Sequence, residues 1–102
     1  MDWSTLHWNT LQEELAAGCD ETADDAVAEQ AVAAAEIVAA AAGEPADELP
    51  PDARDWVETH GVPDDVLVEL ACRSMKSVAA RSEEWQGRLN DLRYRLGDVA
   101  AA

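Results

Sequence analysis

One alanine-rich stretch, residues 23–42, constrains the fold more than any other part of the sequence. Thr22 precedes the stretch as a candidate N-cap, and Gly43 and Pro45 follow it as residues that end helices. At 100° per residue its small apolar side chains fall on one side and its acids fall on the other. The stretch is therefore predicted to be one long helix with a packed face and a charged face.

Four further helices are predicted from apolar spacings of three and four, together with their capping residues: residues 4–17, 51–60, 63–80 and 82–97. Ser82 is the expected N-cap of the last helix, and Gly97 is expected to close it, which leaves residues 98–102 as a frayed tail. Nowhere do β-branched or aromatic residues alternate over the roughly four positions that a strand needs. We expect an all-α, compact single-domain bundle of four to five helices.

The acidity of the chain is regional. Its 102 residues make one domain, residues 1–102, with a net charge of −15. Residues 1–65 hold 17 acids and a single base, Arg54, whereas residues 66–97 are near neutral because six bases balance their acids. A chain acidified for a salty environment is expected to carry acids over its whole surface, so the asymmetry weakens that explanation.

The sequence contains no long uncharged apolar run and no basic start followed by a hydrophobic segment. Neither a membrane span nor a secretory signal is therefore predicted, and the expected location is cytoplasmic. Cys19 and Cys72 lie far apart in a chain without secretory features, which favours reduced thiols over a disulfide.

Residues able to carry chemistry are scarce. The motifs of zinc, calcium and phosphate sites are absent, so no enzyme, cofactor or metal is predicted. His60 is expected to cap a helix C-terminus, and Cys72 to fill space in the core. A catalytic site would have to involve His7, His60 or Cys19.

Arg88, Arg93 and Arg95 lie close together along the chain beside Tyr94 and could contact nucleic acid. The net negative charge would repel a phosphate backbone, however, so direct nucleic-acid binding is disfavoured. We expect these arginines to pair internally with the acidic half of the chain.

The acids as a set predict a partner-binding surface, because uncompensated charge destabilises a compact state and a basic partner would offset that cost. Asp25, Glu29 and Glu36 form a row along the long helix that lysine and arginine side chains could grip in place of phosphates. The predicted partner-binding residues are Asp20, Glu21, Asp24, Asp25, Glu29, Glu36, Glu44, Asp47 and Glu48.

Two resemblances bear on this interpretation. The segments "AVAAAEIVAAAAGEP", "LPPDARDWVETHG" and "WQGRLNDLRYRLG" resemble an uncharacterised family of small, Ala-rich, acidic helical bacterial proteins over about residues 29–97, and that resemblance implies helix packing but no activity. In size and acidity the chain also resembles phage-encoded inhibitors that imitate DNA, such as anti-CRISPR proteins.

The leading hypothesis is a non-enzymatic inhibitor, a monomer or weak dimer, that occupies a basic nucleic-acid-binding groove of a partner. A CRISPR effector whose recognition of target DNA is blocked is the concrete example. The alternatives are an immunity protein or antitoxin that neutralises a cationic toxin or nuclease, and a soluble helical domain with salt-adapted acidity.

Overall fold

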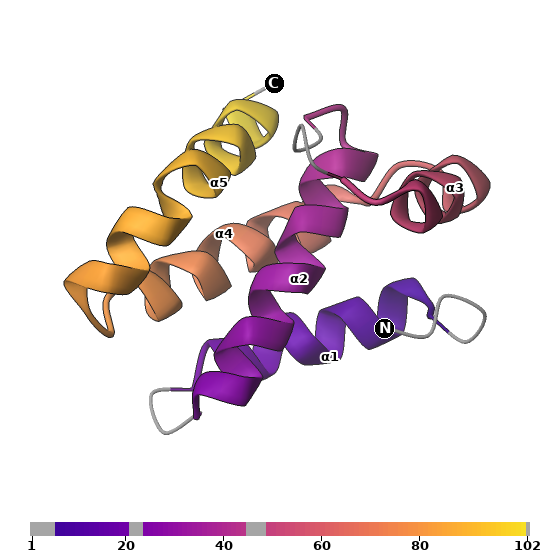
Figure 1. The fold of residues 1–102 in the computed structure, drawn as a ribbon. Coiled ribbons are helices and arrows are strands. Elements are labelled where there is room, and N and C mark those ends of the chain that lie inside the picture. The colour runs from indigo at the N-terminus through magenta and orange to yellow at the C-terminus, as the bar shows by residue number, and fades with distance from the viewer. Residues whose placement is uncertain (1–5, 21–23, 45–48, 102) are drawn as a thin grey trace.

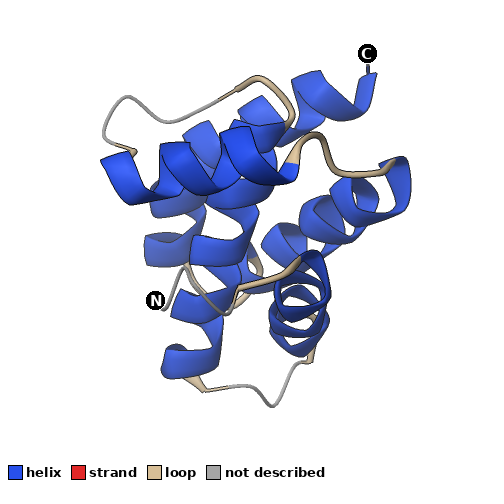
Figure 2. Cartoon of the chain, turned by 90° about the vertical axis from the view of Figure 1, so that its right-hand side faces the viewer, coloured by secondary structure: helices blue, strands red, loops and turns tan. Residues whose placement is uncertain are grey.

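The computed structural model describes residues 6–20, 24–44 and 49–101, and all regular secondary structure in these ranges is helical (Figure 2). Five helices follow one another along the chain (Figure 1). Their bounds are α1 Trp8–Gly18, α2 Asp25–Ala41, α3 Pro51–His60, α4 Asp65–Ala79 and α5 Glu83–Ala101. The predicted all-α fold with four to five helices is confirmed.

The alanine-rich helix α2 lies at the centre of the fold and contacts each of the other four helices (Figure 1). Its buried surface is therefore wider than the single face that the sequence predicts. The predicted face consists of Val27, Ala31, Ala34, Val38 and Ala41. The residues buried in addition to it are Ala28, Ala35, Ile37, Ala39 and Ala40. Small side chains let neighbouring helices approach α2 from several directions, so one alanine-rich helix can serve as the common core of the domain.

Helix α1 approaches α2 and α4 closely at Gly18. A Cβ atom added to Gly18 would lie 2.5 Å from the Cβ of Ala31 and 2.5 Å from the Oγ of Ser74. No real side chain tolerates such distances, so a glycine is required at this crossing. Ser74 is itself fully buried, and its hydroxyl has no hydrogen-bond partner among the described residues.

Two predicted helix starts need correction. The first helix begins at Trp8 and not near residue 4, because His7 is extended and acts as the N-cap. The carbonyl of Leu6 is used outside any helix, since it accepts a hydrogen bond of 3.0 Å from Nε1 of Trp56. The N-cap of α2 is Asp24, whose Oδ1 accepts from the backbone N–H of Val27 at 2.9 Å. Thr22, the predicted cap, lies outside the described residues.

In the C-terminal half, α4 begins at Asp65 with Asp64 as its N-cap, two residues after the predicted start at Pro63. The last helix follows the prediction except at its end. The Oγ of Ser82 accepts from the backbone N–H of Trp85 at 3.3 Å, as expected of the cap of α5. The helix does not stop at Gly97, which is not among the glycines with positive φ, but continues to Ala101. Val99 packs against the core, which favours helix over the predicted frayed tail as far as Ala101. Ala102 lies outside the described residues.

Candidate functional site

The acidic row predicted on α2 faces the chain's own arginines. Arg81, at the α4–α5 junction, lies 3.5 Å from Asp25. Two arginines of α5 occupy the next positions, with 3.0 Å between Arg88 and Glu29 and 3.0 Å between Arg95 and Glu36. Arg88 and Arg95 are seven residues apart and therefore lie on one side of α5. Together with Arg81, which precedes the helix, they match the row on α2.

Arg95 is the most enclosed member of these pairs. Its side chain is 12% exposed, and its guanidinium donates to both carboxylate oxygens of Glu36 at 3.0 Å. It also donates to Asp91 at 2.8 Å and to the backbone carbonyl of Glu44 at 3.2 Å. The hydrogen bonds to the carboxylates of Glu36 and, to a smaller extent, Asp91 raise the pKa of Arg95. The cluster links α5 to the C-terminal half of α2. In it, Arg95 pairs with the negative charges of Glu36 and Asp91.

Arg88 makes the same kind of contact in a more open position. It donates to both carboxylate oxygens of Glu29, and its guanidinium lies 4.3 Å from the centre of the Trp85 ring. The hydrogen bond from Arg88 lowers the pKa of Glu29. The prediction that Arg88 and Arg95 pair with the acidic half is confirmed. No ion pair between described residues involves Arg93.

The remaining predicted binding residues do not gather into one patch of the described surface. Asp24 is used as a helix cap, and Asp20 is exposed after the end of α1. The neighbouring carboxyl of Asp98 raises the pKa of Glu44, first by hydrogen bonding to its protonated form. The other three, Glu21, Asp47 and Glu48, lie outside the described residues. The role of all nine in partner binding stays a prediction, and the ion pairs reduce the free charge on the α2 row.

Free negative charge is concentrated instead in the part of the chain that forms α3, the linker after it and the start of α4. Residues 50–69 carry six carboxylates and one base. The six are Asp52, Asp55, Glu58, Asp64, Asp65 and Glu69. All are exposed, and no ion pair between described residues involves any of them. We call this set the α3–α4 acids.

An aromatic cluster holds α3 against the start of α1. The rings of Trp8 and Trp56 meet edge to face with 4.8 Å between their centres, and the His60 ring stacks on Trp56 at 4.0 Å. Nδ1 of His60 lies within hydrogen-bonding distance, 2.8 Å, of the carbonyl oxygen of Trp56. This contact agrees with the predicted role of His60 as a cap of the helix C-terminus. Trp8 is therefore a packing residue, with its Nε1 donating to the carbonyl of His60 at 3.3 Å.

The candidate chemical residues lie apart. His7 is exposed at the start of α1 and not within the helix, which corrects its predicted place. Cys19 and Cys72 are both half-buried free thiols, and burial raises the pKa of Cys72. Within the ranges that the structure describes, no three residues of the types His, Cys, Asp and Glu come close enough to hold a metal ion.

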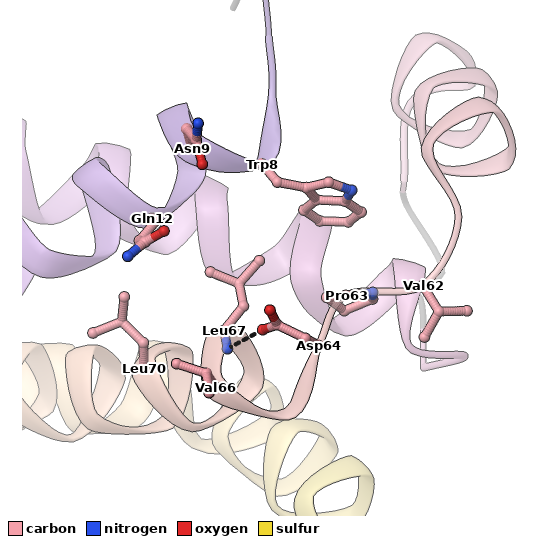
Figure 3. A pocket seen from close by; sticks show the side chains of 9 residues that line it. All are labelled: Trp8, Asn9, Gln12, Val62, Pro63, Asp64, Val66, Leu67 and Leu70. Atoms are coloured by element: carbon pink, nitrogen blue, oxygen red, sulfur yellow. Dashed lines mark hydrogen bonds between the residues drawn. The ribbon is translucent and has the colours of Figure 1, made fainter.

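A hollow of about 280 Å³ opens between the start of α1 and the start of α4 (Figure 3). Trp8 forms one wall, and Leu67 and Leu70 form the other. The remaining lining residues are Asn9, Gln12, Val62, Pro63, Asp64 and Val66. Sequence reasoning missed this hollow. The available signal was a pair of valines, Val62 before the predicted helix 63–80 and Val66 in its first turn, that are apolar although no core position was predicted for them.

The fold and these surfaces define a small acidic all-α domain whose described helices include none with the length and apolar character of a membrane span. Residues 4–91 match the family described as Domain of unknown function (DUF4259). The match covers most of the chain, so the chain belongs to that family. Comparisons with curated proteins and with solved structures found no match. The resemblance to an uncharacterised family is thus confirmed, and the family match makes no connection to anti-CRISPR proteins.

Proposed function

We propose that this chain is a non-enzymatic binding protein that recognises a basic protein surface of the kind that binds nucleic acid. The proposal is supported by a difference between two sets of acids, one paired with arginines and the other without such pairs. The α2 row is matched by Arg81, Arg88 and Arg95, whereas the α3–α4 acids form no ion pair with a described base. Unpaired carboxylates on rigid helices attract lysine and arginine side chains and accelerate association with a basic partner.

Paired and unpaired acids contribute differently to such binding. A carboxylate that already accepts two hydrogen bonds from arginine, as Glu36 does from Arg95, must exchange them for contacts with the partner and gains little. An exposed carboxylate such as Glu58 forms no ion pair with another described residue that binding would have to break. The proposal therefore places the main contact on the α3–α4 acids and assigns the α2 row to holding the fold.

The partner class follows from the chemistry of the charge. Protein surfaces able to neutralise many carboxylates at once are mostly grooves lined with lysine and arginine that hold nucleic acid. The chain would compete with nucleic acid for such a groove. An anti-CRISPR that blocks target-DNA recognition is one specific form of this proposal, and neutralisation of a cationic nuclease by an immunity protein is another.

The test is capture of basic proteins from a bacterial lysate on the immobilised chain, followed by elution with duplex DNA. We expect wild type to retain proteins that DNA displaces. The variant Glu58→Gln/Glu69→Gln should lose most of this capture. The matched control is Glu83→Gln/Glu84→Gln, which removes the same charge from exposed positions in the first turn of α5 and should retain it.

Equal loss from both variants would mean that only net charge matters and would contradict a localised site. If duplex DNA does not displace the captured proteins, a nucleic-acid-binding groove is not the target. Capture of one nuclease encoded beside this gene would select the immunity-protein form of the proposal.

A further inference from the structure

The hollow between α1 and α4 has apolar residues on its open rim as well as on its walls. Val62 is 77% exposed and Val66 is 67% exposed. They are two of the three large hydrophobic side chains that are exposed in the described part of the chain; the third is Tyr94 of α5. Exposed valines beside an apolar hollow continue its surface outward, and an apolar surface of this kind is typical of an interaction site.

A second hollow lies on the other side of the linker, and the two share Val62 and Pro63. Asp65 and Glu69 line the second hollow, while Asp64 lines the first. No base lines either hollow among the described residues. The two exposed valines are thus bordered by three of the α3–α4 acids, so this surface combines apolar contact with negative charge.

We infer that this surface docks a cationic amphipathic helix of the basic partner. An apolar side chain of that helix enters the hollow between Trp8 and Leu67, and lysine or arginine side chains one turn away pair with Asp65 and Glu69. Apolar anchors that recur at three and four positions are the usual way in which a helix binds a groove. The inference rests on the proposed function and adds where and how the partner binds.

The observations favour this occupant over two others. A second copy docked symmetrically would place Asp65 and Glu69 against like charges, which is unfavourable. A small molecule usually fills an enclosed site of about 300–1,000 Å³. The first hollow, at about 280 Å³, falls below that range and suits one or two side chains. The second, at about 630 Å³, has the necessary volume, but Asp65 and Glu69 line it and favour a cationic occupant.

The test uses two fluorescein-labelled helical peptides of about 18 residues, roughly five turns, with identical lysine positions. One peptide has leucine and the other alanine at the apolar positions. Val62→Ser/Val66→Ser should weaken binding of the leucine peptide about tenfold and leave the alanine peptide unchanged. Asp65→Asn/Glu69→Gln should weaken both peptides by a similar factor. Tyr94→Ser is the matched control for an exposed apolar side chain and should change neither.

A second readout follows the indole N–H of Trp8 by NMR, assigned with Trp8→Phe. Its resonance should shift on addition of the leucine peptide and stay in place with the alanine peptide. Circular dichroism of each variant checks the fold, which should be unaffected because the two valines are exposed.

Four results would overturn the inference. If the valine variant binds the leucine peptide like wild type while the acid variant weakens both peptides, docking in the hollow is wrong and the proposed function stands. If wild type binds neither peptide at low salt, the proposed function fails as well. A wild-type dimer that the valine variant abolishes would identify a second copy as the occupant. An equal loss in Tyr94→Ser would show non-specific apolar binding.

Discussion

Replacement of Arg95 by methionine should destabilise the domain by about 2 kcal/mol. Methionine keeps much of the apolar stem but removes the guanidinium. Breaking a fully buried ion pair costs roughly 3–5 kcal/mol, and an exposed pair contributes roughly 0.2–1 kcal/mol. Side-chain exposures of 12% for Arg95 and 29% for Glu36 place this pair between the two limits. The carbonyl of Glu44 would also lose a donor.

Urea denaturation followed by circular dichroism measures the change in unfolding free energy. Arg88→Met is the matched control, because the Arg88–Glu29 pair has the same chemistry but is about half exposed, so its loss should cost clearly less. In a double-mutant cycle, Arg95→Met and Glu36→Gln should be non-additive, since each removes the same contact. Additive effects, or an equal cost at Arg88 and Arg95, would refute the structural role assigned to Arg95.

Three other predictions follow from the core and from the α2 C-terminus. Gly18→Ala should destabilise the fold by roughly 1–3 kcal/mol in thermal melts, because the new methyl group would collide with Ala31 and Ser74. Ser74→Ala should leave stability unchanged or raise it by about 1 kcal/mol, since it removes a buried hydroxyl without a partner, and a clear loss would contradict this. The pKa of Glu44, measured by NMR titration, should lie above that of an ordinary glutamate, and Asp98→Asn should lower it. Because the folded state holds this proton more tightly, the contact stabilises the fold below the ordinary glutamate pKa and is lost as the pH rises through the raised value.

Helix positions could be predicted from the sequence because their signals are local. Pro51 and Gly61 bound α3 as expected, with Gly61 at φ 80°, and Ser82 caps α5. The errors arose where a tertiary contact overrides a local signal. The carbonyl of Leu6 accepts a hydrogen bond from Trp56 outside α1, so that helix starts later than predicted. Helix α5 passes through Gly97, and the partly buried Val99 beyond it packs against the core.

The functional surface was harder to predict because pairing between helices depends on the fold. Sequence reasoning correctly expected Arg88 and Arg95 to pair with acids, yet it also counted Glu29 and Glu36 as binding residues. A carboxylate paired with an arginine of the same chain is less available to a partner, so the two expectations conflict for Glu29 and Glu36. The acids of residues 50–69 were not among the predicted binding residues, and one of them, Asp64, has a local role as the N-cap of α4.

The most direct test compares Glu29→Gln/Glu36→Gln with Glu58→Gln/Glu69→Gln, which remove equal charge from the α2 row and from the α3–α4 acids. Both the unfolding free energy and the affinity for the lysine–alanine peptide are measured for each variant. The first variant should lose stability and keep most of its affinity, whereas the second should keep its stability and lose affinity. If the α2 variant loses as much affinity as the other while remaining folded, the proposed division of the acids is wrong.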